Sequence, residues 1–307
     1  MNSSRVLVVG SLNEDLRLRT PTVPAAGETV LGGPHDWGLG GKGSNQAIAA
    51  ARFGADVGML GRLGDDAGGA KIRGVFADEG IDTELLGTSD DAGTGLALIV
   101  LEPSGENRII VSSGANLQVT PADIDAAAEA VRSAAVVLCQ LEIPLETVAA
   151  TFELAGGTRI LNSAPARSLP ETLLGATDVL VANEIELAML AHLAGADDVA
   201  EPDQIVRAAR SITGTRTVIV TRGAAGAMVI TDDDVLDIPA PKITVADTTG
   251  AGDCFCGVLA GAIAEGTSVQ DAARIAVRAA SLAASREGAA EGMPRRSDID
   301  AAVAGAS

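Results

Sequence analysis

Short apolar, β-branched runs alternate along the chain with longer Ala-rich stretches, and this alternation restricts the possible folds more than any other feature. The runs lie at residues 6–9, 135–141, 159–161, 179–182 and 217–221. Each run has the length of a strand, and the segments between them are long enough for helices, which is typical of βαβ units. The sequence therefore predicts an α/β fold with a mostly parallel sheet and helices on both faces.

Two stretches depart from this pattern, because each alternates with period two and has no helix between its halves. The first stretch consists of residues 16–19 and 28–32. The second consists of residues 94–102 and 107–112, which are separated by a Pro103-Ser104-Gly105 turn. The second stretch predicts an antiparallel hairpin. We expect these segments, about 12–37 and 94–113, to form a small β-lid beside the site. The chain has no Pro- or Ser-rich linker, so residues 1–307 are expected to be one domain.

The charge balance excludes several classes of partner. With 22 basic and 41 acidic residues the net charge is −19, which repels nucleic acid phosphates and anionic membranes. No apolar run approaches the ~18 residues of a membrane span. The cysteines Cys139, Cys254 and Cys256 lack a C-x-x-C spacing and are interpreted as small core residues. These features predict a cytoplasmic protein without nucleic acid or membrane partners.

The richest segment for chemistry covers residues 247–253 and leads into an apolar, helix-like run at 254–264. Thr249 is a plausible N-cap, and the small residues Gly250, Ala251 and Gly252 would leave backbone N–H groups open to an anion. Asp253 in the first turn could have a purely structural role, because a carboxylate there interacts favourably with the helix dipole. It could also accept a proton from an attacking hydroxyl while the amides stabilise a transferring phosphoryl group.

A second glycine cluster, at residues 38–46, leads into an Ala-rich helix. It is not a P-loop, because Gly43 separates Lys42 from Ser44. It could be a bare turn, or it could let the backbone approach a polyhydroxylated ligand, with Lys42 and Asn45 as polar contacts. Other polar residues follow predicted strands, where α/β proteins bind ligands. They are Asn13, Asp15 and Glu142.

Two further segments each allow two interpretations. Asn183 and Glu186 have the spacing of a capping box, and the acidic residues here could also hold water around a Mg²⁺ ion that carries nucleotide phosphates. Residues 221–226 could be a tight turn or a nucleotide-contacting loop. His35 and His192 lie apart from these clusters in the sequence, which argues against a Ser-His-Asp triad.

Taken together in chain order, these segments resemble the ribokinase family of carbohydrate and nucleoside kinases, and the resemblance runs from Gly10 to about Pro294. It is carried by Asn13-x-Asp15, residues 40–46, Gly114-Ala115-Asn116, Glu142, Asn162-x-Ala164-Pro165-Ala166, residues 183–186, residues 221–226 and residues 247–253. The resemblance implies a three-layer α/β domain whose β-lid also forms a dimer contact. It also implies ATP-dependent phosphorylation of ribose at the 5-hydroxyl, with Mg²⁺.

The resemblance assigns a role to each matching residue. Asp253 resembles the general base, and Gly250, Ala251 and Gly252 resemble the anion hole. The sugar-binding positions are Asn13, Asp15, Gly41, Lys42, Gly43, Ser44, Asn45, Glu142 and Asp253. The nucleotide-binding positions are Asn183, Glu186, Thr221, Arg222, Gly223, Ala224, Ala225, Gly226, Gly252 and Val277, with Glu186 also acting indirectly on Mg²⁺.

The resemblance also implies a monovalent cation, K⁺, beside the anion hole. Its expected ligands are Asp247, Thr249, Ala283, Arg286, Gly288 and Gly292. Gly292 stands where a serine is expected, and Cys254 stands where threonine is usual.

Other functions stay open at this point. They include a kinase for deoxyribose, another pentose, a nucleoside or a sugar phosphate, and a non-catalytic sugar-binding or regulatory protein. A sugar phosphate would need extra cationic contacts, for which Arg17, Arg19 and Arg108 are the candidates near the lid. A dehydrogenase is disfavoured, because no G-x-G-x-x-G follows the first strand.

Overall fold

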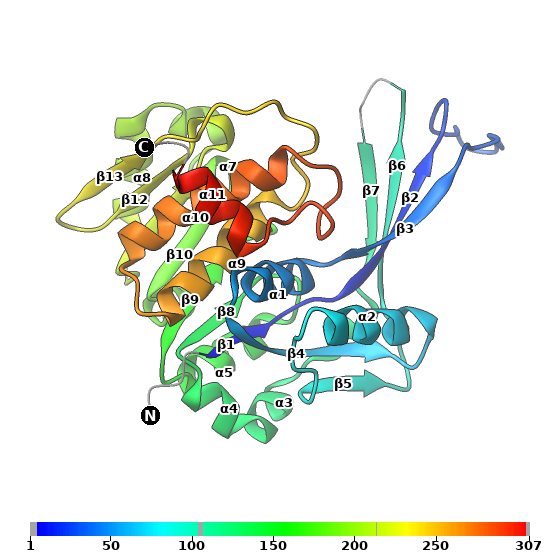
Figure 1. The fold of residues 1–307 in the computed structure, drawn as a ribbon, viewed down its shortest axis with the longest axis horizontal. Coiled ribbons are helices and arrows are strands. Elements are labelled where there is room, and N and C mark those ends of the chain that lie inside the picture. The colour runs from blue at the N-terminus through cyan, green and yellow to red at the C-terminus, as the bar shows by residue number, and fades with distance from the viewer. Residues whose placement is uncertain (1–4, 104–106, 213, 305–307) are drawn as a thin grey trace.

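The computed structural model describes residues 5–103, 107–212 and 214–304, which form two sheets and their covering helices (Figure 1). The large sheet has nine strands in the order β13-β12-β11-β10-β9-β8-β1-β4-β5. Its strands are β1 (Arg5–Val9), β4 (Asp56–Gly64), β5 (Leu86–Ser89), β8 (Val136–Cys139), β9 (Thr158–Asn162), β10 (Val179–Asn183), β11 (Thr217–Thr221), β12 (Ala227–Ile230) and β13 (Val235–Ile238). All pair in parallel except β11 with β12 and β12 with β13. The mostly parallel α/β sheet is therefore confirmed.

Helices cover both faces of this sheet, as its apolar strands require. The side chains of β1 show why: Val6 and Val8 belong to one hydrophobic cluster, whereas Leu7 and Val9 belong to the other. Since side chains alternate between the faces of a strand, an all-apolar strand must be covered on both sides. The helices α1 (Lys42–Phe53), α2 (Ala67–Asp78), α9 (Ala251–Ala264), α10 (Val269–Ala284) and α11 (Arg296–Ala304) contribute to the first cluster. The second contains residues of α3 (Pro121–Ala126), α4 (Ala128–Ser133), α5 (Leu145–Leu154), α6 (Glu171–Gly175), α7 (Glu184–Leu190) and α8 (Pro202–Ser211).

The lid is a separate sheet of four strands in the order β3-β2-β6-β7, which extends away from the main body in Figure 1. The hairpin of β6 (Gly95–Leu101) and β7 (Asn107–Ser112) is confirmed as antiparallel. Its proposed turn residues Ser104 and Gly105 lie outside the described part of the chain. The lid follows β1 directly in the chain, so its first strand starts at the edge of the large sheet where ligands bind in α/β proteins.

One lid strand differs from the prediction. Residues 28–32 form no strand, and the partner of β2 (Asn13–Arg19) is instead β3 (His35–Gly40), which pairs with it antiparallel. The glycines Gly38 and Gly40 of β3 are typical of a turn, which is why the sequence did not predict a strand here. They are accommodated in a strand because side chains of β2 cover them: a Cβ added to Gly40 would collide with Asp15.

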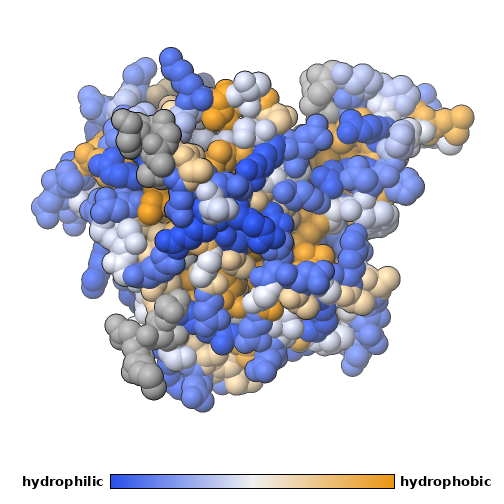
Figure 2. All heavy atoms as spheres, viewed as in Figure 1, coloured by the Kyte–Doolittle hydropathy of each residue, from blue (hydrophilic) through white to orange (hydrophobic). Residues whose placement is uncertain are grey.

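Figure 2 shows a mostly hydrophilic face, on which hydrophobic residues gather near the lid and in smaller patches on the main body. Within the described residues, no helix has both the length and the apolar composition needed to cross a membrane. The three cysteines are free and buried, which confirms their interpretation as core residues.

Candidate active site

Three of the four predicted catalytic residues, Gly250, Gly252 and Asp253, line a cavity of about 140 Å³ at the carboxyl ends of β9, β10 and β11. The cavity is lined by Lys42, Asn162, Ala164, Val181, Asn183, Glu186, Thr221, Gly250, Gly252, Asp253 and Cys256. Parallel strands end at one edge of the sheet, so the polar residues that follow them are gathered there. The start of α1 and the start of α9 complete the wall.

The N-terminus of helix α9 lies at the cavity and has no side-chain cap. Its N-cap is Gly250, with φ +75°, and not Thr249 as the sequence suggested. The N–H of Thr249 instead donates to Asp247 Oδ1 at 2.9 Å, so this residue belongs to the preceding turn. A left-handed backbone favours glycine, and a Cβ added to Gly252 would meet open space. The N-terminus of a 14-residue helix is thus bare where an anion would approach.

Asp253 lies in the first turn of α9 and is fixed by two amide donors from α1. Its Oδ2 accepts a hydrogen bond from Asn45 Nδ2 at 3.0 Å, and its Oδ1 accepts one from Gln46 Nε2 at 2.9 Å. Burial raises the pKa of Asp253, against the opposing effects of Lys42 and the two amides. The carboxylate is therefore oriented, dehydrated and more basic than an exposed aspartate.

A buried polar network behind Asp253 was not recognised as a unit in the sequence. Gln46 Nε2 also donates to Asn162 Oδ1 at 3.0 Å, and Gln140 Nε2 donates to Gln46 Oε1 at 2.7 Å. These residues come from α1, β9 and the end of β8, so only the fold brings them together. Among the described residues, Asn45 Oδ1 is buried without a hydrogen-bond partner. A buried acceptor of this kind is costly unless a ligand donates to it.

The glycine cluster at residues 38–46 packs the start of α1 against the segment after β1. A Cβ on Gly43 would lie 2.6 Å from the backbone of Ser11, so a glycine is required there. Glu142 Oε2 accepts hydrogen bonds from Ser11 Oγ at 2.5 Å and from the N–H of Lys42 at 3.0 Å. Ser44 Oγ donates to Gly40 O. Glu142 thus joins the segment after β1 to the start of α1; it is not among the residues that line the cavity, and its sugar contact stays a prediction.

Lys42 supplies positive charge to this acidic cavity. Burial opposes its charge, but Asp253, Glu142 and Glu186 outweigh this effect and raise the pKa of Lys42. The ammonium group therefore stays charged in the cavity that the N-terminal end of α9 also lines.

Asn13 and Asp15 lie on β2 of the lid and are not among the residues that line this cavity. Asn13 Oδ1 accepts a hydrogen bond from Asn116 Nδ2 at 2.8 Å, and Asn116 Oδ1 accepts one from the N–H of Leu12 at 2.9 Å. Burial raises the pKa of Asp15 to about 6; Arg17 opposes this shift, while Glu142, Glu291 and Asp253 add to it. These influences place Asp15 within electrostatic reach of both Glu142 and Asp253.

Asn183 and Glu186 form the capping box at the start of α7. Glu186 N donates to Asn183 Oδ1 at 2.8 Å, and Asn183 N donates to Glu186 Oε2 at 2.9 Å. The capping interpretation is therefore correct, and the same residues also line the cavity. Burial raises the pKa of Glu186. The described residues contain no group of three or more His, Cys, Asp or Glu side chains placed to hold a metal ion.

The residues predicted to contact nucleotide are only partly gathered at the cavity. Thr221 lines it, and the following five residues form a closed turn in which Arg222 N donates to Gly226 O at 2.7 Å. Within this turn lies the short helix η3 (Gly223–Ala225). Val277 is buried in the core on α10, and its proposed nucleotide contact stays a prediction.

The segment before α9 packs against the loop at residues 285–295, which joins α10 to α11. Burial would raise the pKa of Asp247, but hydrogen bonds from Thr249 and from the N–H of Gly288 hold it below its usual range. Gly292 has little room for a side chain, since an added Cβ would lie 2.6 Å from Gly288 O and 3.5 Å from Ala283 O. Backbone carbonyl oxygens therefore converge at the position where a serine was expected.

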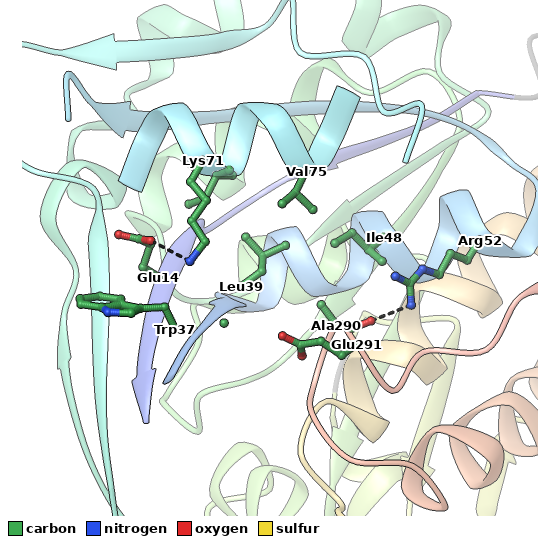
Figure 3. A pocket seen from close by; sticks show the side chains of 11 residues that line it. Glu14, Trp37, Leu39, Ile48, Arg52, Lys71, Val75, Ala290 and Glu291 are labelled. Carbon is green, nitrogen blue, oxygen red and sulfur yellow. Dashed lines mark hydrogen bonds and ion pairs between the residues drawn. The ribbon is translucent and has the colours of Figure 1, made fainter. Parts of the chain in front are cut away.

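A larger cavity, of about 190 Å³, lies between the lid strands β2 and β3, the helices α1 and α2, and residues 290–291 (Figure 3). Helices α1 and α2 contribute the apolar residues Ile48, Ile72 and Val75 to its wall, together with the charged residues Arg52 and Lys71. Glu14 and Leu39 also line it and alternate in sequence with Asn13, Asp15 and Gly40, so they belong to the opposite face of the lid strands. The larger cavity is therefore not where the catalytic groups meet.

Comparison with known proteins adds to this geometry. The model of the pfkB family of carbohydrate kinases matches residues 3–296. A ribokinase from Schizosaccharomyces pombe is 35% identical over 306 residues, covering 96% of each chain. A deoxyribokinase from Salmonella typhimurium is 35% identical over 303 residues, covering 94% of this chain and 95% of that protein. The structure of Arabidopsis thaliana ribokinase complexed with ribose and ATP superposes with a TM-score of 0.90 at 32% identity, covering 98% and 99% of the two chains.

Proposed function

The chain belongs to the pfkB family of carbohydrate kinases, and from this membership and the site we infer that it phosphorylates D-ribose with ATP. The products are D-ribose 5-phosphate and ADP, because the 5-hydroxyl is the primary alcohol that we place at Asp253. One observation carries the proposal: Asp253 is held by Asn45 and Gln46 at the bare N-terminus of α9. This arrangement brings a proton acceptor and an anion-binding helix end to one cavity.

In the proposed mechanism, Asp253 accepts the proton of the 5-hydroxyl as the hydroxyl oxygen attacks the γ-phosphorus of ATP. The bond from the γ-phosphorus to the bridging oxygen breaks, and ADP leaves with that oxygen. Backbone N–H groups at Gly250, Ala251 and Gly252 stabilise the charge on the transferring group, and Lys42, which lines the same cavity, adds a positive charge. Burial supports this role, since it makes Asp253 a stronger base.

The sugar side of the site is formed by residues that differ in how much of their hydrogen-bonding capacity is free. Asn45 Oδ1 has no partner among the described residues and is free to accept from a sugar hydroxyl. Asp15 is half-buried on the lid, and a carboxylate can accept hydrogen bonds from two hydroxyls. The other proposed contacts are Asn13, Gly41, Lys42, Gly43, Ser44 and Glu142, several of which also hold the loops in place.

ATP is proposed to bind where Asn183, Glu186 and Thr221 line the cavity, with residues 222–226 beside it. Mg²⁺ would arrive bound to the phosphates, and Glu186 would act on it through water, since the described residues contain no dedicated cluster of ligands. The metal supplies charge neutralisation on the phosphates.

A K⁺ ion is proposed at the segment before α9, held by Asp247, by backbone carbonyls of Thr249, Ala283, Arg286 and Gly288, and at Gly292. The convergence of Ala283 O and Gly288 O near Gly292 supports this proposal, because hard cations take oxygen ligands. The loss of a serine hydroxyl at Gly292 removes one contact, which water can replace.

A homodimer through the lids is also proposed. The edge strand β7 exposes Ile109, Ile110 and Val111, at 54%, 67% and 51% of their surfaces. An apolar edge strand left open is prone to pair with another chain. On β6, the alternating apolar residues Leu96, Leu98 and Val100 are half-buried. The dimer contact is therefore proposed at β7.

A cytoplasmic location is also proposed, because the buried, unpaired cysteines fit a reducing compartment.

The strongest alternative within this chemistry is a kinase for 2-deoxyribose, since a deoxyribokinase is among the relatives. The test is an ATP-consumption assay with ribose, 2-deoxyribose, other pentoses, nucleosides and fructose 6-phosphate. Ribose should have a higher kcat/KM than 2-deoxyribose, because a missing hydroxyl leaves a buried polar group unpaired at a cost of ~1–3 kcal/mol. An equal or reversed preference would reassign the substrate. Absence of turnover with every acceptor would favour a non-catalytic sugar-binding protein.

A further inference from the structure

Arg17 lies on the lid strand β2, two residues beyond Asp15 and on the same face. The facing strand β3 has glycine at 38 and at 40, so the side chains of β2 can lie flat across it. A Cβ added to Gly38 would be 2.6 Å from Arg17 Nη2, and one added to Gly40 would collide with Asp15. The guanidinium of Arg17 and the carboxylate of Asp15 therefore occupy successive positions over β3.

The charge of Arg17 is matched by two carboxylates. Its Nε donates to Asp36 Oδ1 at 2.6 Å, and its Nη2 lies 3.4 Å from Glu291 Oε1. The first contact stays within the lid, whereas the second joins the lid to the 285–295 loop, 274 positions away in the chain. A guanidinium paired in this way is not free to bind a phosphate group, so Arg17 is no longer a candidate contact for a sugar phosphate.

Glu291 connects this ion pair to the segment that precedes α9. A Cβ added to Gly288 would lie 2.7 Å from Glu291 Oε2, so the carboxylate packs directly on this residue. The N–H of Gly288 donates to Asp247 Oδ2 at 3.1 Å. Figure 3 shows Glu291 on its loop beside the lid strands. A continuous path thus runs from the sugar-facing side of the lid to the start of the anion-binding helix.

We propose that the Arg17–Glu291 ion pair is a latch that holds the lid over the acceptor site, and that both residues are positioning residues for the sugar through Asp15. This inference rests on the proposed function, because it takes Asp15 to be a sugar ligand. Both members of the pair also act on the charge of Asp15, since Arg17 opposes the rise that burial causes in the pKa of Asp15 and Glu291 adds to it. The latch therefore acts on both the place and the charge of that carboxylate.

The test compares Arg17→Met, Glu291→Gln and the double variant with the wild type. Arg19→Met is the matched control, since Arg19 is the next residue on the same face of β2. Each single variant should raise the KM for ribose by roughly twofold to fivefold, as expected for a partly exposed ion pair, and leave the KM for ATP within about twofold. The double variant should be no worse than either single variant, because the two residues act as one unit. Arg19→Met should behave as the wild type.

The pH dependence of kcat/KM is a second readout, because it would not change if Arg17 and Glu291 only stabilised the fold. The charged groups that act on the pKa of Asp15 are Arg17, which lowers it, and Glu142, Glu291 and Asp253, which raise it. Removing the cation in Arg17→Met raises the pKa of Asp15, so the acid limb of kcat/KM for ribose should move to higher pH. Removing an acidic neighbour in Glu291→Gln should move that limb to lower pH.

Two results would overturn the latch. One is a ribose KM within twofold of wild type in both single variants, and the other is a double variant whose loss is the product of the two single losses. If the wild type itself does not phosphorylate ribose, the proposed function fails instead. The latch is then judged by hydrogen exchange of the β2 and β3 amides, which should be faster in both single variants and unchanged in Arg19→Met. Unchanged exchange in all variants would reject it.

Discussion

Replacing Asp253 by asparagine tests the chemical centre of the proposal, because the change keeps the shape of the side chain and removes its ability to accept a proton. In the wild type both carboxylate oxygens accept from amide donors, Asn45 Nδ2 at 3.0 Å and Gln46 Nε2 at 2.9 Å. An asparagine presents one oxygen and one NH₂ group, so it can satisfy only one of these donors. Loss of a general base is expected to lower kcat by ~10²–10⁴-fold.

The stability of Asp253→Asn should change little, because two effects oppose each other. One amide donor loses its acceptor, at a cost of ~1–3 kcal/mol. Against this, burial raises the pKa of Asp253, so ionisation at neutral pH destabilises the folded wild type, and the neutral asparagine is free of that penalty. Since the folded-state pKa is raised, the wild type should gain stability relative to the variant as the pH falls through that pKa.

The assay is steady-state ATP consumption with ribose, together with calorimetric binding of ribose and of ATP to the variant. Binding of both ligands should persist while turnover is lost. Cys256→Ala is the matched control, since Cys256 lines the same cavity on the same helix and has no proposed role in proton transfer. Retention of more than half of the wild-type kcat by Asp253→Asn would refute the general-base assignment.

Further predictions address the sugar contact, the two ions and the dimer. Asn45→Ala should raise the KM for ribose more than the KM for ATP, because it removes the free acceptor Oδ1; equal KM changes would place Asn45 outside the sugar site. Glu186→Gln should increase the Mg²⁺ concentration needed for half-maximal rate, and an unchanged requirement would limit Glu186 to helix capping. KCl titrated at constant ionic strength against tetramethylammonium should activate the enzyme despite Gly292, whereas a flat response would mean that no functional K⁺ site is present. Ile110→Asp should yield monomers in sedimentation at micromolar concentration, and wild type that is already monomeric there would contradict the lid dimer.

Local patterns in the sequence determined the architecture and several individual interactions. The alternation of apolar runs with Ala-rich stretches predicts the mostly parallel sheet, because the burial of a strand on both faces is visible in consecutive residues such as those of β1. The capping box of Asn183 and Glu186 was also predictable, since its two residues are three positions apart and interact within one turn. The Gly-Ala-Gly-Asp segment indicated an exposed helix start, although the capping residue is Gly250 and not Thr249.

The tertiary structure alone decided which polar groups meet. Asp253 receives its hydrogen bonds from residues 208 and 207 positions away, and Arg17 reaches Glu291 across 274 positions. No local periodicity encodes such contacts, because they depend on how strands and helices are placed by packing throughout the domain. The strand β3 shows the same limit: its glycines read as a turn until the side chains of β2 are known to cover them. Secondary structure follows from neighbours in sequence, whereas a site built from several strand ends follows from neighbours in space.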